Sequence, residues 1–169
     1  MKNRICEVLG IEKPVVQGPM VWLTDAGLAA AVSEAGGIAD KRAFRAALAL
    51  GAEGAYCGTA FLLSRESRMA ENVKQAALKA NAQDLLLFRT MPAYYRSLPG
   101  ALAYKLVEMD KSGASREELG KVMGGFANLR KGMLEGDMEN GYVSLGNGIS
   151  DIHEIKSAAE IIREMTAAD

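Results

Sequence analysis

Two glycine-containing segments have the composition of turns that bind a phosphate group. Gly36, Gly37 and Ile38 lie between two segments with helical spacing of apolar residues, and Gly58 and Thr59 fall within a run of small and β-forming residues. Glycine allows the backbone to approach a phosphate closely, and a helix start supplies unpaired N–H groups and partial positive charge. Such segments are also common as helix caps and turns, so the residues alone leave both roles open.

Residues suited to metal binding or nucleophilic catalysis are few. Cys6 and Cys57 are too few and too far apart for a metal-ligand cluster, and His153 is the single histidine. We therefore predict no metal site, with Cys57 as a reduced cysteine in a buried strand. Ser144 and Ser150 lack a nucleophile-elbow pattern. The residues by themselves identify no catalytic group.

The composition is that of a soluble globular protein. The chain has 169 residues, of which 49% are hydrophobic and 24% charged, enough for one domain or one domain with a small appendage. The formal net charge is -1, with basic residues scattered among acidic ones, so we predict no nucleic-acid or membrane partner. No long apolar segment is evident, and we expect a cytoplasmic protein.

The first part of the sequence predicts strands and helices around the two glycine segments. Asp40 is a candidate N-cap, and Gly51 is a candidate helix stop. The predicted elements are a strand over 14–20, a helix over 24–35, a helix over 40–51, a strand over 54–63 and a helix over 66–81.

The rest of the sequence is predicted to be mainly helical. Ser115 and Glu118 have the spacing of a capping box, which marks a helix start. The predicted elements are a helix ending at 113, a helix over 117–123, a short extended segment at 142–145 and a closing helix over 151–165. A complete (β/α)₈ barrel needs eight strands and usually ~250 residues, so this chain cannot form one alone.

Three stretches together resemble one enzyme family. They are ICEVLGIEKPVVQGPMVWLTDAGLAAAVSEAGG, AGGIADKRAFRAALALGAEGAYCGTAFLLSRES and GKVMGGFANLRKGMLEGDMENGYVSLGNGISDIHEIKSAAEII. They are similar to the FMN-dependent nitronate monooxygenases, formerly called 2-nitropropane dioxygenases, and to the related FMN-dependent enoyl-acyl-carrier-protein reductases. The resemblance covers nearly the whole sequence.

The central part of the family's barrel is absent from this sequence. The triplet Ala35-Gly36-Gly37 matches both the end of the first barrel unit and the turn after the seventh strand. The resemblance therefore implies an α/β fold that is a truncated TIM-barrel remnant, with two or three parallel strands and a mainly helical C-terminal portion. We predict a partial barrel segment over 1–65 and a helical portion over 66–169.

The resemblance implies an FMN site built from four segments. Two glycine turns hold the phosphate, a loop after the first strand lies against the flavin ring, and a C-terminal loop lies near the flavin. The matching residues here are Gly36, Gly37 and Ile38, then Gly58 and Thr59, then Gly18, Pro19 and Met20, and finally Gly146 and Asn147. At Asn147 the family usually has glutamine.

The family's catalytic histidine has no counterpart. In the family it follows a Glu-Ala-Gly-Gly stretch, whereas here that stretch is followed by Ile38, which cannot transfer a proton. His153 matches no catalytic position. The resemblance thus implies an FMN-dependent oxidoreductase of nitronate monooxygenase type, acting on a nitronate or an enoyl thioester, that is catalytically impaired.

A non-catalytic protein is the alternative. The first and last barrel strands could pair in parallel and leave two open edges, and exposed apolar residues such as Trp22, Phe61 and Leu62 would favour association. The chain would then be a self-associating helical remnant without a cofactor. Under either interpretation we expect a homo-oligomer.

Overall fold

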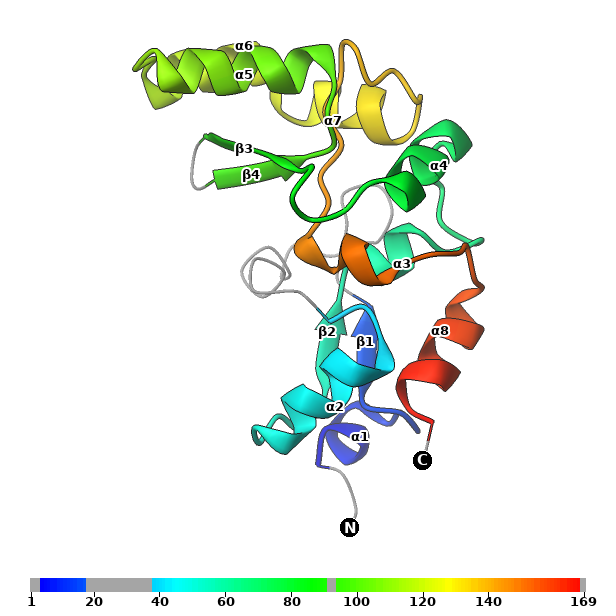
Figure 1. Ribbon diagram of the computed structural model, residues 1–169. Coiled ribbons are helices and arrows are strands. Elements are labelled where there is room, and N and C mark those ends of the chain that lie inside the picture. Colours follow the sequence, from blue (N-terminus) through cyan, green and yellow to red (C-terminus); the bar gives the residue numbers. More distant parts are fainter. Residues whose placement is uncertain (1–3, 18–37, 91–93, 168–169) are drawn as a thin grey trace. The chain divides into compact units, whose positions relative to one another are not determined.

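The computed structural model describes residues 4–17, 38–90 and 94–167 of the chain. The chain forms two compact units, which Figure 1 shows. Residues 1–67 and 148–169 make up the first unit, and residues 68–147 make up the second. The C-terminal segment therefore folds with the N-terminal segment. The division into a partial barrel segment over 1–65 and a helical portion over 66–169 stays a prediction.

A parallel pair of strands lies at the centre of the first unit. Strand β1 (Val15–Gln17) pairs with β2 (Ala55–Cys57) with Val15 opposite Ala55 and Gln17 opposite Cys57. Both strands therefore end at the same level. The α/β class with few parallel strands agrees with the sequence prediction.

Short helices complete the first unit. Asp40 caps the second of them as predicted, with its carboxylate accepting a hydrogen bond from the N–H of Ala43 at 2.8 Å. Gly51, with a φ of 99°, adopts the left-handed conformation just after this helix. The helices are α1 (Arg4–Leu9), α2 (Lys41–Ala49), α3 (Thr59–Leu62), the 3-10 helix η2 (Asn147–Asp151) and α8 (Ala158–Met165).

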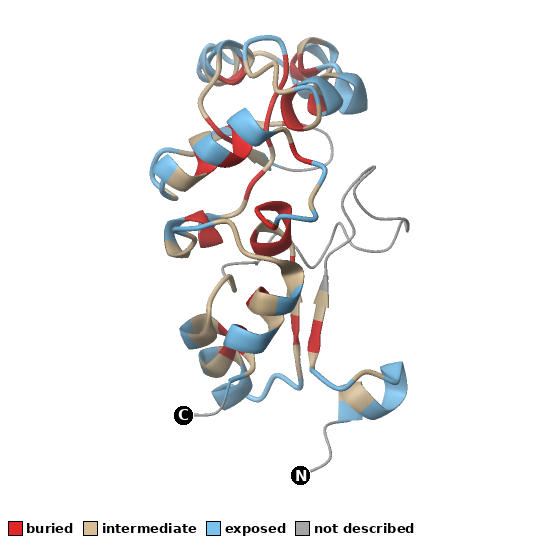
Figure 2. Cartoon of the chain, turned by 90° about the vertical axis from the view of Figure 1, so that its right-hand side faces the viewer, coloured by how far each residue is buried: buried red, intermediate tan, exposed pale blue. Residues whose placement is uncertain are grey.

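One face of the strand pair forms the core of the first unit. Val15, Ala55 and Cys57 are buried there, and Figure 2 shows buried and partly buried positions alternating along β2. The side chains packed with them come from α2, α3 and α8, namely Phe44, Ala60, Phe61, Ile161 and Met165. Burial of Cys57 confirms the prediction for that residue.

Residues 54–63 were predicted to form one strand, but the structure divides them between a strand and a helix. Strand β2 ends at Cys57, and α3 begins immediately after Gly58. Phe61 and Leu62 are 4% and 5% exposed, so the prediction that they form exposed apolar surface was wrong. Because α3 is a single buried turn, its consecutive apolar residues resemble a buried strand in the sequence. Trp22 lies outside the described residues.

The second unit contains helices and an antiparallel hairpin. Its capping box at Ser115 and Glu118 is present as predicted and starts the third of its helices. The elements are α4 (Glu71–Lys79), β3 (Leu86–Arg89), β4 (Tyr94–Ser97), α5 (Ala101–Lys111), α6 (Arg116–Met123) and α7 (Gly125–Met133). The helix predicted over 66–81 is shorter in the structure, where it begins at Glu71.

The hairpin β3–β4 was not predicted. Leu86 pairs with Ser97 and Arg89 with Tyr94, and Phe88 between them is fully buried. The extended segment predicted at 142–145 lies beside the hairpin, because Ser144 forms an antiparallel bridge with Ser97. Aromatic residues favour strands, but the sequence here lacks the alternation that would have indicated one.

The closing helix is shorter than predicted. Instead of one helix over 151–165, η2 ends at Asp151 and α8 begins after Ser157. Ser157 and Glu160 form a capping box in which each side chain accepts from the other residue's backbone N–H. This cap fixes the start of α8. His153 consequently lies between the two elements and not within a helix.

Candidate functional site

The described residues include part of the predicted cofactor site. Ile38, Gly58 and Thr59 belong to the first unit, whereas Gly146 and Asn147 are the last residues of the second. Gly146 is half-buried, and Asn147 is exposed. The other predicted residues, Gly18, Pro19, Met20, Gly36 and Gly37, lie outside the described residues.

Gly58 and Thr59 form the junction between β2 and α3. Both residues are half-buried, and the carbonyl oxygen of Gly58 accepts hydrogen bonds from the N–H groups of Phe61 and Leu62, each at 3.0 Å. A helical turn thus begins directly at the carboxyl end of β2. This is where parallel strands in α/β proteins present phosphate-binding turns.

A second helix start follows Ile38. The side chain of Ile38 packs against the core cluster, and the chain then enters α2 through its cap, Asp40. Burial opposes ionisation of Asp40, but hydrogen bonds from Ala43 and Arg42 outweigh it, so the pKa of this carboxyl lies below 3.8. Asp40 is therefore a carboxylate at neutral pH.

One cavity adjoins both helix starts. It has a volume of about 450 Å³ and is lined by Ala39, which follows Ile38, and by Ala60, which follows Thr59. Its volume lies within the range of small-molecule sites. Apolar side chains from the core of the unit line it as well, among them Leu63, Ile161 and Met165.

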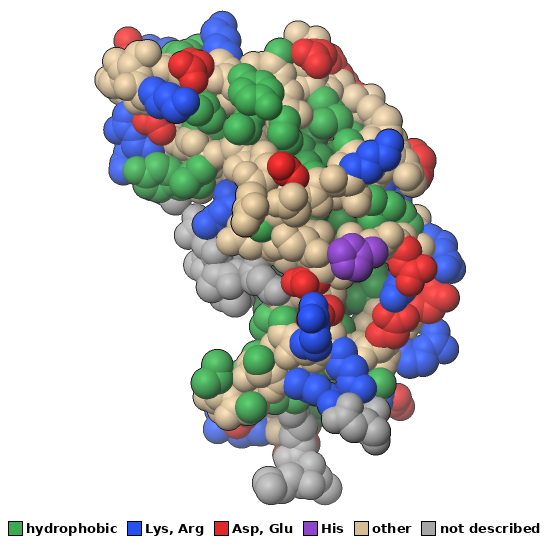
Figure 3. Space-filling model, viewed as in Figure 1, with side chains coloured by type: hydrophobic (Ala, Val, Ile, Leu, Met, Phe, Trp, Pro, Cys, Tyr) green, Lys and Arg blue, Asp and Glu red, His purple; other side chains and the backbone are tan. Residues whose placement is uncertain are grey.

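Ion pairs surround this cavity. Lys156 lies between Glu164 and Glu154, with its Nζ 2.5 and 2.9 Å from their carboxylates. These contacts, that with Glu164 foremost, raise the pKa of Lys156. His153 also lines the cavity and is exposed, and it is the purple side chain at the surface in Figure 3.

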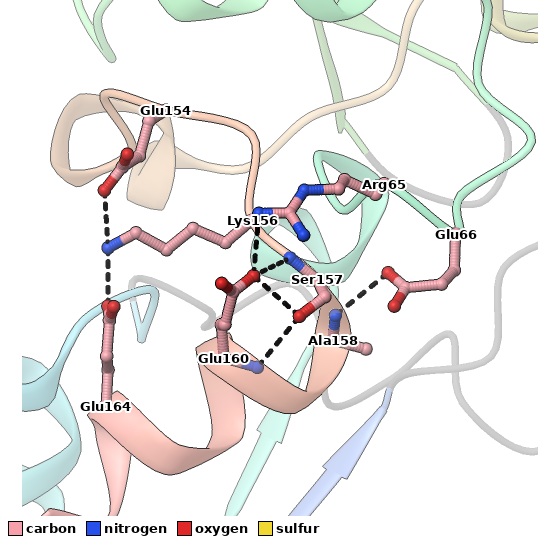
Figure 4. A network of polar contacts seen from close by, with 8 residues as sticks. All are labelled: Arg65, Glu66, Glu154, Lys156, Ser157, Ala158, Glu160 and Glu164. Atoms are coloured by element: carbon pink, nitrogen blue, oxygen red, sulfur yellow. Dashed lines mark hydrogen bonds and ion pairs between the residues drawn. The ribbon is translucent and has the colours of Figure 1, made fainter.

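A polar network holds α8 against the segment after α3. Arg65 pairs with Glu160 at 2.9 Å, and Glu66 accepts a hydrogen bond from the N–H of Ala158 at 2.9 Å (Figure 4). The capping box at Ser157 adjoins these contacts. The network therefore fixes one wall of the cavity.

Candidate catalytic groups are few in the described part of the chain. Burial raises the pKa of the Cys57 thiol to about 11, so this residue is not a thiolate near neutral pH. Across residues 4–17, 38–90 and 94–167, no cluster of three or more His, Cys, Asp or Glu side chains could hold a metal ion. Within the same residues, every helix is too short or too polar to cross a bilayer.

Comparison with known families identifies the family of the chain. A family model described as nitronate monooxygenase matches residues 34–168. The chain belongs to the nitronate monooxygenase family. The match begins beside the Ala35-Gly36-Gly37 triplet and includes both helix starts at the cavity.

Individual proteins match this nitronate monooxygenase family member over part of their length. A Mycobacterium tuberculosis H37Rv protein named as a monooxygenase is 43% identical over 60 residues, 36% of this chain and 16% of that protein. A Bacillus subtilis 168 protein named as a nitronate monooxygenase is 45% identical over 60 residues, 36% of this chain and 17% of that protein. The matched segment is thus about one sixth of either relative.

A solved structure is similar over nearly the whole chain. FabK from Thermotoga maritima has a TM-score of 0.68 and 27% identity, covering 96% of this chain and 56% of that one. A variant of the same FabK has a TM-score of 0.63, with 28% identity, 96% coverage of this chain and 54% of that one. The chain therefore spans just over half the length of this structural neighbour.

Some cavity residues were not singled out from the sequence. Lys41, Asp151 and Lys156 line the cavity but belong to no motif. Asp40 was predicted only as a cap. The sequence signal for Lys41 was a basic residue directly after that cap, because a first helical turn usually has acidic residues.

Proposed function

We propose that this chain is an FMN-binding member of the nitronate monooxygenase family whose oxidoreductase activity is impaired. The observation that carries the proposal is that residues following both predicted phosphate turns, Ala39 and Ala60, line one cavity. The phosphate would be held by the turns at Gly36, Gly37 and Ile38 and at Gly58 and Thr59. The loop at Gly18 to Met20 would lie along the flavin.

The turn at Gly58 and Thr59 is the described helix start that suits a phosphate, because helix starts bind anions through backbone N–H groups. The start of α2 is already capped by the carboxylate of Asp40. Gly58 has no side chain to hinder close approach of a phosphate to the backbone. When bound, FMN would supply the electron transfer, while the chain binds and orients it.

A truncated barrel is the architecture that supports this site. The chain covers 56% of FabK while aligning over 96% of its own length, as expected if central barrel units are absent. Val16 pairs with Tyr56 on the sheet face opposite the core, and the Tyr56 hydroxyl is buried with no partner in the described residues. Parallel sheets are normally covered on both faces, so this face suits the interior of a barrel.

The impairment follows from Ile38. An aliphatic side chain occupies the position after Glu-Ala-Gly-Gly, where the family resemblance implies a catalytic histidine. We expect nitronate or enoyl-thioester turnover no faster than with free FMN. Turnover clearly above that background would contradict the claim that the base is missing.

The phosphate turn is tested by two variants of equal size. Gly58→Asp places a carboxylate beside the proposed phosphate, and Gly58→Asn places an uncharged amide there. The φ of Gly58 is -102°, so both side chains are compatible with the backbone. We expect the Asp variant to bind FMN at least about tenfold more weakly than the Asn variant, as measured by flavin titration. Equal FMN affinities would show that the turn does not contact the phosphate.

Association without a cofactor is the second candidate function. It is favoured by exposed apolar residues of the first unit, since Val8 is 76%, Leu9 54% and Leu50 90% exposed. A homo-oligomer in the cytoplasm would follow. Light scattering of wild type and Leu50→Asp tests it, because a monomeric wild type contradicts this function whether or not flavin binds.

A further inference from the structure

We infer that Asn147 is a site of spontaneous modification, at which the side-chain amide is lost and aspartate or isoaspartate forms. Asn140 and Asn147 are the two asparagines in the sequence that are followed by glycine. Glycine has no Cβ, so its backbone nitrogen can approach the side-chain carbon of the preceding asparagine with little hindrance. Both asparagines are exposed. The structure distinguishes them by their hydrogen bonds, and the inference does not depend on flavin binding.

The reaction takes place within two adjacent residues and uses only water. The backbone nitrogen of Gly148 attacks Cγ of Asn147, so an N–Cγ bond forms and the Cγ–Nδ2 bond breaks. The side-chain nitrogen leaves as ammonia, and the proton that the glycine nitrogen gives up balances the one that ammonia gains. Water then opens the cyclic imide at either carbonyl group, which gives aspartate or isoaspartate. Nothing is oxidised or reduced.

Neither reacting group at Asn147 is held by a hydrogen bond within the part of the chain that the structure describes. The side-chain amide of Asn147 has no partner there. Asn147 is the first and Gly148 the second of the five residues of η2. Because the hydrogen bonds of a 3-10 helix join residues three apart, the N–H of Gly148 has no acceptor within η2, and it donates to no other described backbone group. Helix ends fray, so Asn147 can adopt the geometry of attack.

Asn140, by contrast, is held away from this reaction. Its Nδ2 donates to both carboxylate oxygens of Asp137, at 3.1 and 2.9 Å. The N–H of Gly141, the group that would attack, donates to the backbone carbonyl oxygen of Asp137 at 2.9 Å. These hydrogen bonds must break before Asn140 can react. We therefore expect Asn147 to react at least about tenfold faster than Asn140 in the folded protein.

The modification changes the start of η2. Aspartate adds a negative charge there, and isoaspartate adds a main-chain carbon directly before Gly148. Gly148 and Ile149 are buried, so a longer main chain at this point should disturb their packing.

The test is incubation of the full chain at mildly alkaline pH in water enriched in heavy oxygen, which labels a residue only when its imide is hydrolysed. Trypsin then releases the peptide 132–156, which contains both asparagines and no internal lysine or arginine. Tandem mass spectrometry of this peptide compares the two positions in one molecule. We expect the label chiefly at position 147 in the folded chain, and similar labelling of both positions in urea, where the hydrogen bonds of Asp137 are lost.

Matched variants test the physical reason for the difference. Asp137→Ala removes the carboxylate that holds Asn140, so it should speed the reaction at Asn140 and leave that at Asn147 unchanged. Asn147→Gln should abolish labelling at position 147. Equal labelling of the two positions in the folded chain, or faster labelling of Asn140, would overturn the inference. So would a folded chain in which Asn147 stays unlabelled, whether or not it reacts in urea.

Discussion

The guanidinium of Arg42 lies 3.1 Å from the carboxylate of Asp151, which joins the start of α2 to the end of η2. The same guanidinium lies 2.7 Å from Asp40, the N-cap of α2. The side chain of Arg42 is 83% exposed, so water and salt screen both contacts. The cap hydrogen bond from Ala43 to Asp40 is therefore the more important interaction for stability.

The first prediction separates the cap from the ion pair. Asp40→Ala removes the side chain that accepts from Ala43 and should lower the free energy of unfolding by about 1 kcal/mol. Arg42→Gln leaves the cap in place and should have a smaller effect. Urea denaturation of both variants measures this. An equal loss in the two variants would mean that the ion pair, and not the cap, stabilises the start of α2.

The second prediction concerns glycines in two helices of the second unit. A Cβ on Gly132 of α7 would collide with the backbone carbonyl oxygen of Tyr142, whereas a Cβ on Gly120 of α6 would meet nothing within 4 Å. Gly132→Ala should destabilise the protein by at least about 1–3 kcal/mol. Gly120→Ala should stabilise it by roughly 0.5–1 kcal/mol, because alanine is the better helix former. Thermal unfolding of the pair checks both signs, and a neutral Gly132→Ala would contradict the close packing of α7 on Tyr142.

The third prediction is a pH dependence at α8. Hydrogen bonds from the side chain and backbone of Ser157, together with Arg65, lower the pKa of Glu160 from 4.5 to about 2. A carboxyl whose pKa is depressed by folding contributes stability above its unfolded value and loses it as the pH falls towards the folded value. The stability difference between wild type and Glu160→Gln should therefore be complete above about pH 4.5 and decline towards pH 2.

The control for this titration is Glu117→Gln. Glu117 lies on α6 with its side chain 78% exposed and pairs with Lys121. Its replacement should leave the acid dependence of stability close to that of wild type. Denaturant unfolding between pH 2 and pH 6 provides the comparison, and parallel curves for wild type and Glu160→Gln would rule out the role of the capping box.

The fourth prediction tests the core of the first unit. Phe44 is 3% exposed and packs with Cys57, Ile161 and Met165, so Phe44→Ala should cost about 3–5 kcal/mol of unfolding free energy. Leu50→Ala, at a residue 90% exposed, should change stability by less than about 0.5 kcal/mol. Comparable losses at the two positions would show that α2 does not bury Phe44 in solution.

Local signals predicted much of the fold. Asp40, Gly51 and the Ser115–Glu118 pair have short-range roles, because caps and stops depend on a few neighbouring residues. The parallel strands at Val15 and Ala55 were also recognised from short apolar segments. The end of the second strand was overestimated, since Gly58 starts a helical turn where the apolar pattern continues.

Interactions between distant residues account for what the sequence did not indicate. The hairpin at Phe88 and Tyr95 is joined by the segment around Val143, whose N–H bonds to Ser97. No local pattern encodes that contact. The candidate site was also predicted only in part. The glycine turns were evident as motifs, but the cavity was not. The cavity required residues 39–41, 60–63 and 151–167 to come together.

The central claim is that the two turns hold the phosphate of FMN. The most direct measurement is the Kd of the wild-type protein for FMN and for riboflavin, titrated under identical conditions. We predict that FMN binds at least about tenfold more tightly, because only FMN carries the group that the turns contact. Equal affinities, or no binding of either flavin, would contradict the claim.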